Sequence, residues 1–92
     1  MKDQDLNEFC ALISDIAHGL FDGDADRCDV QFVRGDRKVT FVIRPKDKEA
    51  CSRITGKHGR IIHRIDAVVE VYGELRGMDF DVVVDQPPSP GV

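Results

Sequence analysis

A short segment in the second half of the chain has two glycines around two basic side chains, Gly56-Lys57-His58-Gly59, and Arg60 follows it. Glycine has no Cβ atom, so a phosphate group could approach the main chain closely here. Lys57 and Arg60 would add positive charge beside that phosphate, and His58 would add charge only when protonated. These residues predict a site that binds an anion, and a phosphodiester backbone has the matching chemistry.

The segments on either side of these glycines have the apolar spacing of helices. Asp47 can cap a short helix whose inward residues are Ala50, Cys51 and Ile54. A longer helix follows the glycines, and its apolar residues are Ile61, Ile62, Ile65, Val68, Val69, Tyr72 and Leu75. Its first N–H groups would be unpaired and would favour an anion. Arg53 and Arg64 would extend the basic rim if they face the same way.

The sequence of this longer helix also predicts which of its residues lie in the core and where the helix ends. Ile62, Ile65, Val68 and Val69 are expected to lie mainly in the core. Gly73 weakens the helix by about 1 kcal/mol relative to alanine. Arg76 and Gly77 fit the end of a helix.

The first third of the chain predicts one more helix. Its apolar stripe is Leu6, Phe9, Cys10, Ile13, Ile16, Ala17 and Leu20. Asp5 is expected to cap this helix, with Glu8 three residues later as in a capping box. The cluster Asp22-Gly23-Asp24 would end it.

Alternating apolar residues predict three strands, with the inward rows Cys28/Val30/Phe32, Val39/Phe41/Ile43 and Phe80/Val82/Val84. Gly35-Asp36 reads as a tight hairpin turn in which glycine tolerates a positive φ. The order is then α-β-β-α-α-β, an α+β domain with helices on one face of a three-stranded sheet. The last two strands should be parallel, with a right-handed crossover. We expect a single domain over residues 5–85 and a disordered tail over residues 86–92.

Charge is distributed unevenly along the 92 residues, whose net charge is −4. The stretch from Arg34 to Arg64 holds ten bases and three acids, a net +7, and the remainder is −11. This division predicts a basic face for a polyanion. The alternative is that the charges only solvate several surfaces.

Several function classes have little support in the sequence. No apolar run approaches the ~18–20 residues that span a bilayer, and no apolar signal segment opens the chain. Cys51 with His58 or His63 could form a nucleophilic pair, but Cys51 lies on an apolar stripe and is better explained as a buried thiol. His58 and His63 are poorly spaced for a metal, and no nucleotide-binding loop is present. We therefore expect no enzyme activity, no metal and no cofactor. Cys10, Cys28 and Cys51 are expected to be free thiols in a reducing cytoplasm.

The glycine segment and its surroundings resemble the KH RNA-binding domain. The resemblance is carried by Ile54-Thr55, Gly56-Lys57-His58-Gly59, Ile62 and Ile65, and it covers about Leu6 to Asp85. The order of elements is similar to the type II, bacterial arrangement. In length and layout the chain is most similar to the small stand-alone bacterial KH proteins of the KhpA family.

This resemblance implies a non-enzymatic protein of the bacterial cytoplasm that binds single-stranded RNA. The loop would clamp the backbone of about four nucleotides, for which the salt slope is roughly −3. The RNA-binding residues implied are Gly56, Lys57, His58, Gly59, Arg60, Arg53, Ile54, Ile62 and Arg64, with Ile54 and Ile62 forming the floor of a groove. Asp79, Asp81 and Asp85 would oppose RNA if they faced that groove.

The resemblance also implies partners. KH proteins of this kind form homodimers or pair with a second KH protein called KhpB or Jag. An alternative is a protein-interaction module in which the fold serves mainly dimerisation, through the helix near Val68–Leu75 or through the acidic surfaces.

Overall fold

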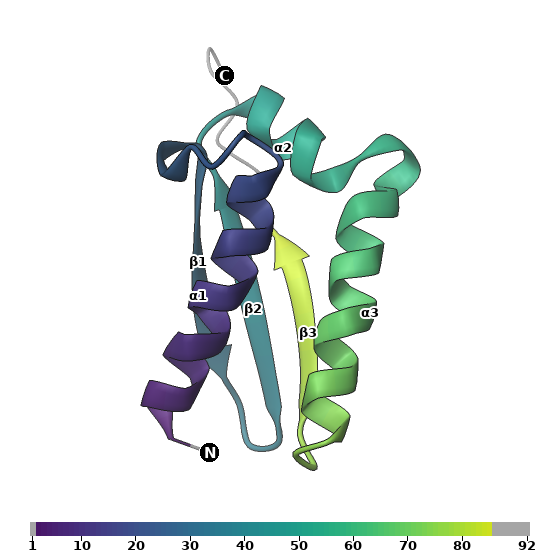
Figure 1. Cartoon of the computed structure of the whole chain (residues 1–92). Helices are drawn as coiled ribbons and strands as arrows, with labels where there is room; N and C mark the ends of the chain where they lie inside the picture. Colours follow the sequence, from purple (N-terminus) through teal and green to yellow (C-terminus); the bar gives the residue numbers. More distant parts are fainter. Residues whose placement is uncertain (1, 86–92) are drawn as a thin grey trace, which may run out of the picture.

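The computed structural model describes residues 2–85, and the tail predicted over residues 86–92 lies outside them. The chain forms three helices, two short 3₁₀ turns and three strands (Figure 1). In order they are α1 (Asp3–Gly19), η1 (Ala25–Arg27), β1 (Cys28–Arg34), β2 (Lys38–Pro45), α2 (Lys48–Thr55), η2 (Lys57–Gly59), α3 (Arg60–Glu74) and β3 (Asp79–Val84). The predicted α+β class and element order are confirmed.

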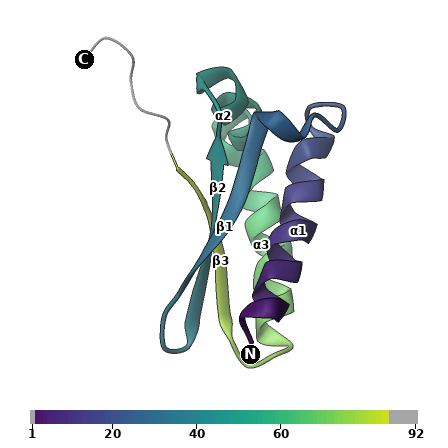
Figure 2. The ribbon, with the colours of Figure 1, turned by 90° about the vertical axis from the view of Figure 1, so that its left-hand side faces the viewer.

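The three strands form one mixed sheet in the order β1-β2-β3. β1 and β2 are antiparallel, with Val30 opposite Ile43, and β2 and β3 are parallel, with Phe41 opposite Val82. All three helices lie on one face of this sheet, and the other face is open (Figure 2). In Figure 1 the helices stand in front of the sheet and β3 lies to the right of β2, so the crossover is right-handed, as expected.

The turn between β1 and β2 differs from the prediction. Three residues, 35–37, separate the strands, and the Gly35 N–H donates to the Lys38 carbonyl oxygen at 2.7 Å. Gly35 does not have a positive φ. The expected left-handed glycine is therefore wrong, because a connection of this length closes the hairpin without it.

The start of α1 also differs from the prediction. The helix begins at Asp3, and Lys2 is the capping residue. Asp5 lies inside the first turn, where its carboxylate accepts a hydrogen bond from the Lys2 N–H at 3.2 Å. The capping box expected between Asp5 and Glu8 is therefore wrong. Asp5 still stabilises the start of the helix, because a negative charge in the first turn interacts favourably with the positive end of the helix dipole.

The core lies between the sheet and the helices. The inward row of β2 is buried, as predicted, and so are Phe80 and Val82 of β3, whereas Val84 is half-buried. Phe41 and Phe80 meet edge to face with ring centroids 5.2 Å apart. α1 contributes Leu6, Ile13 and Ala17 from its buried stripe. His18, at the end of α1, shares a 3.0 Å hydrogen bond with the Cys28 carbonyl oxygen, which joins this helix to the start of β1.

The inner face of α3 is narrower than predicted. Its buried residues are Ile65, Val69 and Gly73, which recur at every fourth position. Val68 is 52% exposed, so its assignment to the core is wrong. The reason is geometric, because Val68 lies about 100° around the helix from Val69.

Gly73 lets α3 approach β3 closely. A Cβ atom at this position would lie 2.8 Å from Phe80 Cβ and 2.8 Å from the Met78 carbonyl oxygen. The Asp66 carboxylate of the same helix accepts a hydrogen bond from the Val82 N–H at 2.8 Å. α3 thus packs against β3 and accepts a hydrogen bond from one main-chain N–H on the outer edge of that strand.

We predict that Gly73→Ala destabilises the fold by about 1–3 kcal/mol, because the added methyl group overpacks the contact with Phe80. This loss exceeds the gain of about 1 kcal/mol that alanine brings to a helix. Urea unfolding measures the difference. Gly19→Ala is the matched control, since no atom lies within 4 Å of the Cβ position at Gly19. Equal stability of Gly73→Ala and wild type would contradict the prediction.

Candidate nucleic-acid interface

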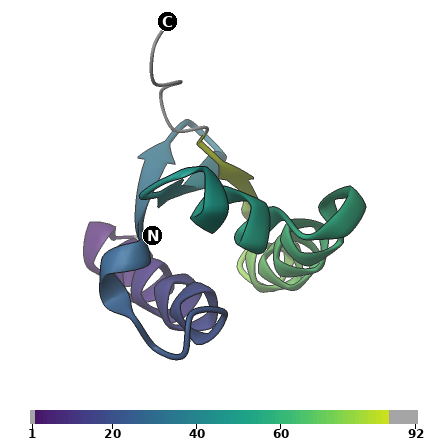
Figure 3. The same ribbon diagram turned by 90° about the horizontal axis from the view of Figure 1, so that it is seen from above.

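The segment Gly56-Lys57-His58-Gly59 forms the bend between α2 and α3. It projects from a corner of the molecule, at the end where α3 begins (Figures 1 and 3). Lys57 and His58 are exposed, and Lys57–Gly59 form a single 3₁₀ turn. The predicted location between two helices is therefore correct.

The backbone of this loop uses conformations that most residues avoid. φ is positive at Gly56 (77°), His58 (58°) and Gly59 (72°). His58 carries a Cβ atom, and a left-handed conformation costs such a residue about 1–2 kcal/mol. Strain of this kind clusters at binding sites. Nothing in the residue pattern identified His58 as left-handed.

The two glycines have different roles, whereas the sequence predicted the same role for both. Gly56, with φ 77° and ψ 172°, occupies a region open essentially to glycine alone. A Cβ atom there would lie 2.7 Å from Ile61 Cγ1, so the chain's own side chain fills that side. No atom lies within 4 Å of the corresponding position at Gly59. On this side of the backbone a phosphate can therefore approach the main chain at Gly59, whereas Ile61 occupies the space beside Gly56.

The first N–H groups of α3, beside the same loop, have no side-chain cap among the described residues. Gly59 is the residue that precedes the helix. By contrast, the Asp47 carboxylate caps α2 by accepting from the Ala50 N–H at 2.8 Å, as predicted. The positive end of the α3 dipole thus lies beside the loop without a carboxylate to offset it.

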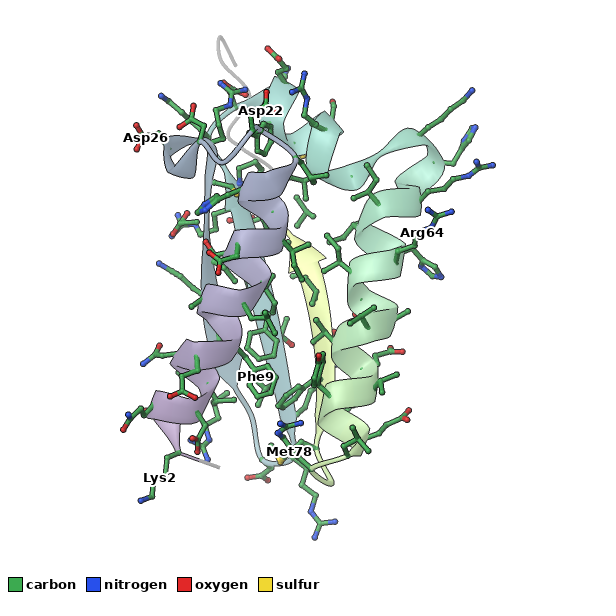
Figure 4. The ribbon with its side chains drawn as sticks, in the orientation of Figure 1. Lys2, Phe9, Asp22, Asp26, Arg64 and Met78 are labelled. Carbon is green, nitrogen blue, oxygen red and sulfur yellow. The ribbon has the colours of Figure 1, made fainter. Side chains whose placement is uncertain are left out.

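Cations without ion pairs gather at this helix start. Within residues 2–85, Lys57, Arg60 and Arg64 make no ion pair. Side chains tipped with nitrogen extend outward around the loop and Arg64 (Figure 4). They border an open hollow of about 580 Å³, lined by His58, Gly59, Arg60, Ile62, His63 and Arg64.

The basic stretch from Arg34 to Arg64 does not form one face. Three of its ten bases are paired with acids from outside the stretch: Arg34 with Asp3 at 2.7 Å, Lys38 with Asp81 at 3.7 Å and Arg44 with Asp85 at 3.8 Å. A fourth, Arg53, is paired with Glu49 of the same helix at 3.8 Å. The prediction of a continuous basic face is wrong, because strand and helix geometry send neighbouring bases in different directions. Of the six bases that make no ion pair with a described residue, three lie at the loop and the start of α3, namely Lys57, Arg60 and Arg64, and the other three lie elsewhere, namely Arg37, Lys46 and Lys48.

Two expected site residues are directed elsewhere. Ile54 is 0% exposed and belongs to the core, so it cannot form the floor of a groove. The Arg53 guanidinium lies over the Phe21 ring at 5.6 Å and pairs with Glu49. Ile62 is half-buried and lines the hollow beside the loop, as a base-contacting residue would.

The acidic residues of β3 lie away from this interface. Phe80 and Val82 point into the core, so Asp79, Asp81 and Asp85 lie on the opposite, open face of the sheet. Asp81 and Asp85 are paired there with Lys38 and Arg44. Their charge therefore does not oppose an anion at the loop.

The cysteines and histidines do not assemble another site. Burial raises the pKa of the Cys10 thiol, and burial together with the charge of Asp29 raises the pKa of the Cys28 thiol. Both shifts disfavour the reactive thiolate. Cys51 is buried, whereas His58 and His63 are exposed. In the described part of the chain no group of side chains fits a metal ion, and no helix is long and apolar enough to cross a membrane.

We predict that Gly56→Ala destabilises the fold more than Gly59→Ala does. Alanine at position 56 meets Ile61 and adopts a backbone conformation that only glycine populates well, whereas alanine at position 59 meets only a left-handed penalty of about 1–2 kcal/mol. Urea unfolding of both variants measures the difference. Equal losses at the two positions would show that Ile61 does not fill the space beside Gly56.

The comparisons with known proteins add no assignment to this geometry. No protein-family model, curated protein or solved structure matches the chain.

Proposed function

We propose that this chain is a non-enzymatic protein that binds single-stranded RNA through the loop between α2 and α3. The observation that carries the proposal is the group of unpaired cations, led by Lys57 and Arg60, at a helix start without a side-chain cap. The resemblance of the loop and the element order to type II KH domains supports the same function. A protein of this kind acts in the cytoplasm.

In the proposed complex the sugar–phosphate backbone runs past Gly59, where no side chain blocks the main chain. Lys57 and Arg60 neutralise adjacent phosphates, and the helix dipole of α3 favours the same charge. Arg64 lies one turn further along the hollow. Ile62 offers an apolar surface to a base. The left-handed His58 keeps its own side chain and that of Lys57 outside the core, where a polynucleotide can reach them.

Binding through this interface would be weak and tolerant of sequence. No Phe, Tyr or Trp side chain lines the hollow beside the loop, where the only aromatic rings are the imidazoles of His58 and His63. The stacking on large aromatic rings that contributes about 1–3 kcal/mol per base in many single-strand binders is therefore missing. Affinity would come mainly from phosphate contacts, so the slope of log K against log salt should lie between about −1.4 for two phosphates and roughly −3 for four.

We predict that Lys57→Asp combined with His58→Asp abolishes RNA binding and leaves the helix content unchanged. The double variant places two negative charges where phosphates would lie, and both side chains are exposed. Fluorescence anisotropy with a labelled single-stranded RNA measures binding, and circular dichroism measures helix content.

A matched control separates the loop from bulk charge. Lys48→Asp with Gln31→Asp changes the net charge by the same amount, but at the far end of α2 and on the open sheet face, where both residues are exposed. This control should retain most of the wild-type affinity. Unchanged RNA binding in the loop variant, or equal loss in both variants, would overturn the proposal.

A further inference from the structure

Two imidazole rings line the hollow beside the loop between α2 and α3. His58 belongs to the loop itself, and His63 lies in the first turn of α3. Both side chains are exposed. The spacing of the two histidines is poor for a metal ion, and the resemblance to KH domains implies no role for His63. This ring is therefore the one part of the hollow without a function so far.

His63 lies where an RNA strand would leave the loop. It follows Gly59 by four residues, so the two positions lie on the same side of the helix start, about 6 Å apart along its axis. Gly59 is where a phosphate can reach the main chain, and Arg60 and Arg64 line the same hollow. A strand that passes Gly59 and continues along the first turn of α3 therefore meets the His63 ring.

The other ionisable groups of the hollow are all cations. Arg60 and Arg64 line it together with the two rings, and Lys57 precedes His58 in the loop. No carboxylate from residues 2–85 lines this hollow. A proton on either imidazole would thus add positive charge to a place that already holds two guanidinium groups.

The carboxylates of the neighbouring elements lie elsewhere. Glu49 of α2 pairs with Arg53, and the Asp66 carboxylate of α3 accepts a hydrogen bond from a main-chain N–H of β3. The acids of β3 lie on the open face of the sheet, and Glu70 and Glu74 border a separate hollow near the end of α3. Among the described residues no acid is placed to balance a proton on His58 or His63, whereas a bound phosphate would be.

We infer that His63 is a further RNA-contacting residue, and that His58 and His63 take up protons when a phosphodiester enters the hollow. This inference rests on the proposed function and states how the same site is regulated. A neutral imidazole offers a phosphate one N–H donor, whereas a protonated ring offers two donors and a positive charge. Histidine changes between these two forms between pH 5 and pH 8. RNA binding therefore strengthens as the pH falls through this range.

Fluorescence anisotropy with a labelled oligouridine at pH 6 and pH 8 tests the coupling, since neither uracil nor a phosphodiester titrates between these values. The wild-type affinity should rise on the order of tenfold from pH 8 to pH 6, because an opposite charge in contact shifts a protonation equilibrium by about this factor. His63→Gln should bind like wild type at pH 8 and several-fold more weakly at pH 6. The double variant His58→Gln with His63→Gln should bind almost independently of pH, through the remaining bases.

A variant that moves one histidine is the matched control. His63→Gln with Gln31→His keeps the number of histidines but places one on the open sheet face, where position 31 is exposed. It should reproduce the pH profile of His63→Gln, because a distant imidazole cannot contact the bound phosphate. Circular dichroism at both pH values checks that each variant has the wild-type helix content.

The possible results separate this inference from the proposed function. Absence of RNA binding at both pH values would overturn the proposed function, and the inference with it. Wild-type binding of equal strength at pH 6 and pH 8, or the full wild-type rise in the double variant, would overturn the inference alone. His63→Gln binding as tightly as wild type at pH 6, or recovery of the wild-type rise in the moved-histidine control, would overturn the contact with His63.

Discussion

Parallel pairing of β2 with β3 is the constraint on which the rest of the structure depends. Two parallel neighbours cannot be joined by a hairpin, so the chain must travel back along the sheet between them. It does so through α2 and α3, which meet at an angle and leave the Gly56–Gly59 bend at a corner. The bend is exposed because it is the point where the return path changes direction, and its glycines permit the backbone conformations that the change requires.

The same return path places α3 against the edge strand. Gly73 allows the helix and β3 to touch, and Asp66 satisfies a main-chain N–H on that edge. α3 therefore has one face committed to the core. Because the helices cover only one side of the sheet and α1 stands apart from α3, the opposite face of α3 has no neighbour among the described residues.

Charge is also distributed by the fold. Acids from α1, α2 and β3 pair with four bases of the central stretch, and these pairs are mostly exposed, so they contribute little to stability. Their main consequence is to reduce the isolated positive charge on the sheet. Three of the six bases left without an ion pair lie around the start of α3, where Lys57, Arg60 and the helix dipole act in the same direction. A mildly acidic chain can in this way present a small cationic site.

Elements and inward rows were readable from the sequence, because hydrophobic periodicity and the Asp47 cap are local properties. The loop was readable for the same reason, since glycines and bases are next to one another in the chain. Local patterns could not show that Ile54 is sealed in the core, that Arg53 turns to Phe21, or that Val68 faces solvent. Those outcomes depend on which side of each helix meets the sheet, and on residues distant in sequence such as Phe21 and Phe80. Residue types along the chain thus determined the elements and the chemistry of the bend, whereas packing between distant elements decided which side chains remain available to a ligand or a partner.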